Sequence, residues 1–252
     1  MALEVRLFPC LSDNYAILVR DQLTGEAATI DTPDASAILE AAERLGWRLT
    51  RVFNTHWHPD HAGGNAAVQS ATGAIIYGPS EVSRIAPLDY AVTEGEVLEL
   101  GASRLTVLET PGHTNGHVCF YSPEDHIAFV GDTMFALGCG RLFEGTAQTM
   151  WSSLSKLAAL PDETLVYCAH EYTASNARFA LSLDQDAVVA ARCQEIFDRR
   201  ATGKPTVPTT IGLEKATNPF LRASVLASSL GSFSSPDEAF ALVRGAKDAF
   251  KG

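Results

Sequence analysis

The chain has 252 residues, of which 46% are hydrophobic and 19% are charged, so its composition is that of a globular protein. Its formal net charge of −11 at pH 7 argues against a nucleic-acid partner. It contains no run of 18 apolar residues, so we expect no membrane-spanning segment and no membrane partner.

The start of the chain and its cysteines favour a cytoplasmic protein. Residues 1–7 lack the basic and apolar regions of a secretory signal, and their pattern predicts a strand. The five Cys are an odd number, are scattered along the chain and show no CxxC spacing. This usage favours reduced thiols, as in the cytoplasm. For the assembly state we expect a monomer.

The first elements alternate between strand and helix. Ala27–Ile30 predicts a strand that ends at Asp31. Thr32, Pro33 and Asp34 predict a helix start, with Thr32 as the cap and the proline in first position, and Gly46 predicts the end of that helix. Residues 49–54 alternate apolar and polar side chains and predict a second strand.

The segment directly after this second strand is the most informative in the chain. Residues 55–61 read Thr-His-Trp-His-Pro-Asp-His, and they hold three of the 7 His of the whole chain. Imidazole nitrogens and carboxylate oxygens are the ligands that zinc, iron and manganese accept. An accidental cluster in a polar loop is disfavoured, because adjacent His residues without a metal would add nothing to stability. We therefore predict a metal site on this strand-to-helix loop.

Three further apolar runs each deliver a candidate ligand at their ends. Strands expected at residues 105–108, 127–130 and 165–169 run into His113, Asp132 and His170 respectively. A sheet can bring such strand ends together, so we expect these side chains to complete the metal site. Of the two remaining His, we expect His117 to be a buried or supporting side chain and His126 to be solvated.

The composition changes after about residue 172. Residues 187–200 have a helical pattern, residues 203–208 predict a rigid Pro-containing loop, and Ser235-Pro236-Asp237-Glu238 predicts a last helix with a serine cap. No further strand is expected there. We therefore predict two domains, a catalytic domain at residues 1–172 and a helical substrate-binding domain at residues 173–252.

The ligand motif and the strand ends together resemble the metallo-β-lactamase superfamily over roughly residues 5–170. The resemblance implies an α+β fold, an αββα sandwich here followed by the small helical domain. It implies two divalent metal ions per chain, with zinc expected first and iron or manganese also accepted by this ligand set. One metal would be held by His56, His58 and His113, the other by Asp60, His61 and His170, and Asp132 would bridge them.

Further segments resemble the hydroxyacylglutathione hydrolase (glyoxalase II) family from end to end. They are residues 10–15, 131–135, 138–145, 168–173, 205–210, 218–222 and 244–250. The resemblance implies hydrolysis of S-(2-hydroxyacyl)glutathione, usually S-D-lactoylglutathione, to D-lactate and glutathione, which is the second step of methylglyoxal detoxification. It places Arg141, Phe143, Tyr172, Asn176, Arg244 and Lys247 at the glutathione.

Two of these positions depart from the family pattern. Many members have Lys in place of Arg141, and many have Tyr in place of Phe143, which cannot donate a hydrogen bond. Without the resemblance, Arg244 and Lys247 would be interpreted as a solvated helix face, since they lie three apart near the chain end.

The implied mechanism is attack on the thioester carbonyl by a hydroxide that the two metals share. Asp60 or Asp132 would orient it and take its proton. The thiolate leaves without a strong acid, because a thiol pKa is only about 8.5. Asp31 is expected either to hold a ligand His in place or to serve the helix entry.

The sequence leaves three alternatives open. The first is a persulfide dioxygenase of the same superfamily with a single iron held by two His and one Asp, and the second is a lactamase or another hydrolase of that superfamily. The third is a non-catalytic protein that keeps the fold, which would require a missing ligand, and none is missing.

Overall fold

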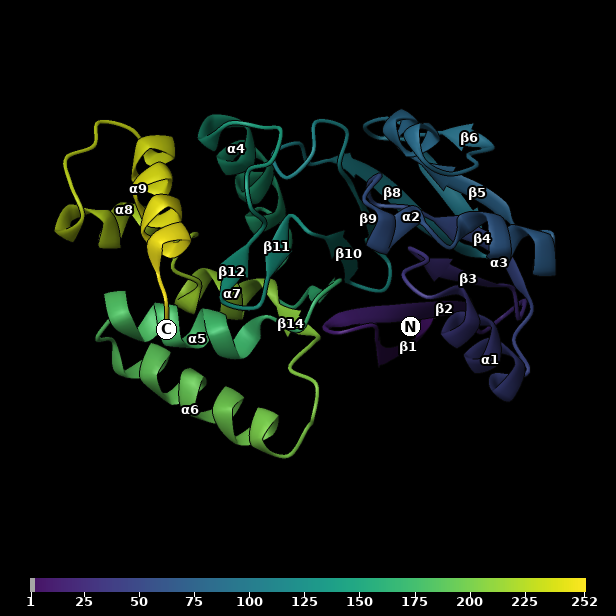
Figure 1. Cartoon of the computed structure of the whole chain (residues 1–252), viewed down its shortest axis with the longest axis horizontal. Helices are drawn as coiled ribbons and strands as arrows, with labels where there is room; N and C mark the ends of the chain where they lie inside the picture. The colour runs from purple at the N-terminus through teal and green to yellow at the C-terminus, as the bar shows by residue number, and fades with distance from the viewer. Residues whose placement is uncertain (1–2) are drawn as a thin grey trace. The chain divides into compact units, whose positions relative to one another are not determined.

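The computed structural model describes residues 3–252, so Met1 and Ala2 of the expected first strand lie outside the described residues. The chain divides into two compact units. The first runs to Glu109 and continues from Gly116 to Gly131, and the second comprises Thr110–Asn115 and Asp132–Gly252. Figure 1 labels the elements of both.

The first unit contains a mixed six-stranded sheet with its strands in chain order. The first three strands are antiparallel and the next three pair in parallel. The strands are β1 (Leu3–Cys10), β2 (Asn14–Asp21), β3 (Ala27–Ile30), β4 (Leu49–Phe53), β5 (Ile75–Gly78) and β6 (Tyr90–Ala91).

Helices cover one face of this sheet. They are α1 (Ala35–Leu45) and α3 (Asn65–Thr72), with the short α2 (Pro59–Ala62) before α3 and the 3-10 turn η1 (Ser80–Arg84) after β5. Ile38 of α1 and Val68 of α3 join a buried cluster with Leu18, Leu49 and Ile76 of the strands. Figure 1 shows α1 beside β2 in this unit.

A second set of strands faces the other side of the sheet. It is an antiparallel run in the order β10-β9-β8-β7, with bounds Val97–Leu100 (β7), Ser103–Glu109 (β8), Val118–Ser122 (β9) and Ile127–Gly131 (β10). The rings of Phe53 in β4 and Phe120 in β9 lie 5.5 Å apart, and both are fully buried. The core of the first unit therefore lies between the two sheets and under the helices.

The second unit is mostly helical. Its helices are α4 (Ala147–Ala158), α5 (Thr173–Leu183), α6 (Ala187–Ala201), α7 (Ile211–Thr217), α8 (Ala223–Leu226), η2 (Ala227–Ser229) and α9 (Pro236–Ala249). Its strands are β11 (Met134–Phe135), β12 (Gly138–Cys139), β13 (Leu165–Cys168) and β14 (Thr209–Thr210). Helices α5 and α6 run side by side in Figure 1 and enclose a cluster with Ala177, Val189 and Cys193.

Two local expectations were wrong. The cap of α1 is Asp34, whose carboxylate accepts from Ala37 N at 3.1 Å, because Thr32 is engaged elsewhere: its hydroxyl donates to Asn65 at 2.8 Å. Strands also do not stop at Tyr172, since β14 pairs with β13. The stop at Gly46 and the cap at Ser235 are confirmed.

The helix expected at residues 187–200 is confirmed as α6. All five Cys are buried free thiols. Among residues 3–252, none of the helices has the length and apolar character that crossing a bilayer requires.

Candidate metal centre and substrate site

The ligand motif begins where β4 ends. His56 is fully buried, and His58 precedes the short helix α2, whose first residue is Pro59, a position that suits proline because its missing N–H has no helical partner. The helix then places Asp60 and His61 on its first turn. The Asn54 amide donates to the His61 carbonyl at 3.1 Å and ties the end of the motif back to its start.

Asp31 fixes the orientation of His61. Its carboxylate oxygen Oδ2 lies 2.8 Å from His61 Nδ1. Since a carboxylate only accepts, Nδ1 carries the proton and Nε2 is left as the ligand atom. Thr55 N and its hydroxyl also donate to Asp31, at 2.7 and 2.8 Å. Of the two roles that the sequence left open for Asp31, the structure thus shows the contact with a candidate ligand, His61.

Another His packs behind the motif. The His117 ring stacks on His56 with centroids 4.9 Å apart, and His117 is fully buried, as expected. Gly131 has φ +47, and a Cβ there would lie 2.7 Å from His117 Nε2, so glycine is needed for this close packing. His126 is exposed, as expected.

The second unit groups two candidate imidazole ligands around one carboxylate. His113 Nε2 lies 3.3 Å from Asp132 Oδ2, and His170 Nε2 lies 3.4 Å from Asp132 Oδ1. His113 Nδ1 donates to the Arg141 carbonyl at 2.9 Å, which again leaves Nε2 as the ligand atom. Asp132 therefore presents one oxygen to each imidazole, which is the arrangement that a bridging ligand needs.

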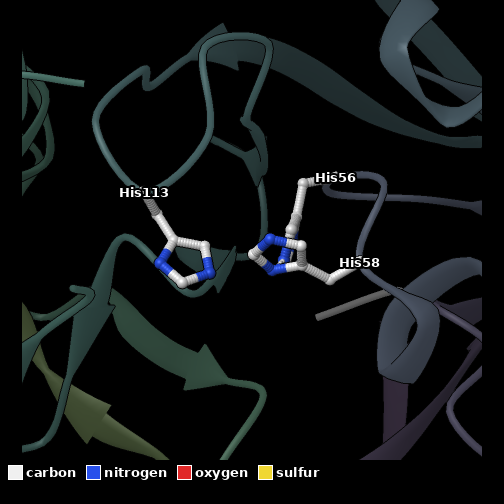
Figure 2. A group of neighbouring side chains, drawn as sticks. All are labelled: His56, His58 and His113. Carbon is white, nitrogen blue, oxygen red and sulfur yellow. Dashed lines mark hydrogen bonds between the residues drawn. The ribbon is translucent and has the colours of Figure 1, made fainter. Parts of the chain in front are cut away.

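Three sets of these side chains have ligand atoms within 4.8 Å of one another. The sets are His56, His58 and His113; His56, His61 and Asp132; and Asp60, His61 and His170. Figure 2 draws the side chains of the first set, and the imidazole rings of His56 and His58 lie beside each other in it. The nitrogen and carboxylate donors suit a divalent metal ion.

Two exposed aromatic rings flank the ligands of the second unit. The Tyr172 ring stacks on His170 with centroids 4.7 Å apart and an interplanar angle of 4°. The Phe143 ring meets His113 edge-on at 5.2 Å and is 61% exposed. Both rings are therefore placed to touch a substrate beside the ligands.

Two residues expected at the glutathione are buried against the backbone. Asn176 donates to the Ala136 carbonyl at 3.1 Å. Arg244 is only 5% exposed, donates to the Cys139 carbonyl at 3.2 Å and lies over the Phe220 ring. The interpretation of Arg244 as part of a solvated helix face is thus wrong.

Lys247 lies in a basic environment. Its ammonium donates to the carbonyl and hydroxyl of Ser175, at 3.3 and 3.2 Å. Burial lowers the pKa of Lys247, and so do the nearby charges of Arg244, Arg141 and Arg178, while Asp248 raises it. Arg141 and Arg178 are exposed. This cationic group (Arg141, Arg178, Arg244 and Lys247) offers charges to an anionic ligand.

Comparisons with known proteins agree over the whole chain. Residues 15–170 match the metallo-beta-lactamase superfamily model, and residues 171–250 match the hydroxyacylglutathione hydrolase C-terminus model. A hydroxyacylglutathione hydrolase of Maricaulis maris is 55% identical, with 98% of this chain and 99% of the relative covered. One of Erythrobacter litoralis is 50% identical, with 98% and 100% covered. The chain belongs to the hydroxyacylglutathione hydrolase family.

Membership of the hydroxyacylglutathione hydrolases confirms the α+β metallo-β-lactamase fold with its C-terminal helical part. The solved structure of TTHA1623, described as in a di-iron-bound form, is 25% identical with a TM-score of 0.63 and covers 86% of this chain and 100% of its own. The dioxygenase alternative is not favoured, because the C-terminal match is to the hydrolase. The fold and the donor cluster indicate metal ions.

Two residues beside the candidate site, Asn14 and Arg178, are not predicted from the sequence. Asn14, within the residue 10–15 segment, donates to Asp60 Oδ2 at 3.2 Å. Arg178 lies three residues after Ser175 on α5, so both side chains lie on one face of that helix. The first could have been found from its place in a family motif, the second from its helical spacing.

Proposed function

We propose that the chain hydrolyses the thioester bond of S-(2-hydroxyacyl)glutathione, with S-D-lactoylglutathione as its substrate. Water adds to the carbonyl carbon, the C–S bond breaks, and D-lactate and glutathione are released, which completes methylglyoxal detoxification. One observation supports this proposal above all. The chain has a net charge of −11, yet it contains both a set of seven candidate metal donors and a cationic group that can bind an anionic substrate.

The seven donors would hold two divalent metal ions per chain, with zinc expected first. His56, His58 and His113 would hold one ion and Asp60, His61 and His170 the other, with Asp132 between them. The His61 and His113 contacts leave Nε2 free of its proton, as a metal ligand requires. Such ions would lower the pKa of a bound water toward about 7 and polarise the thioester carbonyl.

The carboxylates of Asp60 and Asp132 are the catalytic groups in this proposal. Asn14 donates to Asp60 Oδ2 at 3.2 Å and so holds this carboxylate in one orientation, and a carboxylate is a suitable acceptor for the proton of the attacking water. The leaving thiolate has a pKa of about 8.5 and departs without a general acid.

The cationic group serves substrate binding. Glutathione carries two carboxylates and one ammonium, so it is anionic and is repelled at long range by the net charge of the chain. Arginine can clamp a carboxylate through two parallel hydrogen bonds. Tyr172 and Phe143 supply ring surface beside the ligands. Arg141, Arg244, Lys247 and Asn176 complete the proposed contacts.

We propose a cytoplasmic monomer and a domain boundary between residues 172 and 173. The boundary is supported by the two family models, which meet between residues 170 and 171.

The test is hydrolysis of S-D-lactoylglutathione, followed by loss of thioester absorbance, with the metal content of the same sample. We expect turnover with about two metals per chain, its loss in His58→Ala, and a raised KM in Arg244→Ala. Two bound metals without turnover would move the substrate elsewhere in the superfamily. One iron per chain with oxygen uptake on glutathione persulfide would support the dioxygenase instead.

A further inference from the structure

A short hairpin connects several parts of the proposed site in the second unit. Strands β11 and β12 pair Met134 with Cys139 and Phe135 with Gly138. Directly before the hairpin lies Asp132, and shortly after it lies Arg141, whose carbonyl accepts from His113 Nδ1. The position of this hairpin therefore determines where two proposed metal ligands lie.

The hairpin cannot hold its own shape. Each strand has two residues, and an isolated two-stranded hairpin is marginal in water. Leu137 at its turn has φ 55, in the left-handed region that a leucine rarely adopts. Such a conformation persists where surrounding contacts enforce it.

Side chains from the C-terminal helices supply those contacts at five consecutive residues. Their hydrogen bonds are Asn218 Nδ2 to the Phe135 carbonyl (3.3 Å) and to the Gly138 carbonyl (3.0 Å), Asn176 Nδ2 to the Ala136 carbonyl (3.1 Å), Leu137 N to Glu214 Oε2 (2.9 Å), and Arg244 Nη1 to the Cys139 carbonyl (3.2 Å). All four side chains are at most 5% exposed. Every residue from Phe135 to Cys139 thus has a backbone group that is hydrogen-bonded to one of these four side chains.

Glu214 and Asn218 form the centre of this arrangement. The buried carboxylate of Glu214 is balanced by Arg192 and also accepts from Asn218 Nδ2 at 2.9 Å. Asn218 Oδ1 accepts from Phe220 N at 3.0 Å, so both ends of its amide are used. A buried polar network with its groups satisfied fixes one geometry, whereas apolar packing alone would tolerate several.

We infer that Glu214 and Asn218 are positioning residues that hold the 134–139 hairpin, and through it Asp132 and His113, in the geometry for metal binding. The C-terminal helices then have a second role beside substrate contact. The inference rests on the metal-ligand roles proposed above for Asp132 and His113.

The test uses Asn218→Asp, which keeps the size of the side chain but replaces the donor with a carboxylate facing two carbonyls and Glu214. In the metal-free full-length chain we expect the amides of residues 135–139 to exchange about tenfold faster. We expect zinc affinity, measured by chelator competition, to fall about 10- to 100-fold. In the loaded enzyme kcat should fall while KM stays unchanged.

The matched control is Asp184→Asn. It removes the charge from a largely buried carboxylate in the same helical region, which forms an ion pair with Arg222 at 2.8 Å. It should leave hairpin exchange and zinc affinity at wild-type values. Equal exchange and equal zinc affinity in Asn218→Asp and wild type would overturn the inference.

If Asn218→Asp does not fold, Asn218→Ala removes the same donors without adding charge and carries the same expectations. Neither exchange nor zinc affinity depends on the substrate. A wild-type chain that binds zinc but does not hydrolyse the thioester would therefore refute the proposed function, while the effect of Asn218→Asp on the hairpin would still decide this inference.

Discussion

The carboxylate of Asp31 lies 2.8 Å from His61 Nδ1, although the two residues are 30 positions apart in the chain. Asp31 is itself in the left-handed region, with φ 57, and is 4% exposed. A strained, buried residue of this kind is retained where its contacts require it, here by Thr55 and His61 together.

Replacing Asp31 with Asn should weaken metal binding about 10- to 100-fold, because the amide removes the negative charge that makes His61 a stronger ligand. Metal content after dialysis against a chelator measures this. The matched control is Asp34→Asn, the same change at the cap of α1, where Asn caps equally well. Equal metal retention in the two variants would show that Asp31 does not act on His61.

Gly140→Ala should disturb the candidate metal ligands of the second unit. A Cβ at Gly140 would lie 2.0 Å from the Asp132 carbonyl oxygen and 3.2 Å from His113 Nδ1, so the backbone beside two proposed ligands must shift. We expect loss of bound metal and a lower melting temperature, read by metal analysis and thermal unfolding.

The control for that change is Gly245→Ala. Gly245 lies inside helix α9, and a Cβ there would meet nothing within 4 Å. Alanine should stabilise the helix by about 1 kcal/mol and leave metal content unchanged. A Gly140→Ala protein with normal metal content would contradict the close packing around Asp132.

The candidate ligands could be predicted from sequence because each follows a short apolar strand. His56, His113, Asp132 and His170 all lie just beyond the ends of β4, β8, β10 and β13. Local strand patterns and the single motif at residues 55–61 therefore suffice to predict most of the candidate ligands. The sequence left two roles open for Asp31, holding a ligand His or serving the helix entry. Only its contact with His61, 30 residues away in the chain, distinguishes them.

The predictions that were wrong or missing also depend on contacts between residues far apart in the chain. The following Pro33 favours Thr32 as a cap, but the Thr32 hydroxyl donates to Asn65, 33 residues away. The contacts of Glu214 and Asn218 with the hairpin span 77 to 83 residues. No local periodicity reports such pairs, so the sequence assigned the C-terminal helices to the substrate alone.

Phe143→Tyr should improve substrate binding. The ring is 61% exposed and lies edge-on to His113, so an added hydroxyl would reach solvent or a bound peptide without repacking the core. One new hydrogen bond should lower KM about two- to tenfold. The KM of the variant for S-D-lactoylglutathione checks this, and an unchanged KM would place the glutathione away from this ring.

Lys247 should make substrate binding sensitive to alkaline pH. Burial and the charges of Arg244, Arg141 and Arg178 lower the pKa of its ammonium below the ordinary 10.5, against the opposing charge of Asp248. As pH rises through this lowered pKa, the side chain loses its charge and KM should rise, while kcat is less affected.

Lys247→Arg separates this effect from other alkaline titrations, because a guanidinium stays charged throughout the range. Its KM should remain flat over the pH interval in which the wild-type KM rises. Because the folded-state pKa is lowered, the charged lysine opposes folding at any pH below that pKa. Lys247→Gln should therefore raise KM without lowering the melting temperature, and a KM that rises with pH equally in wild type and Lys247→Arg would assign the titration to another group.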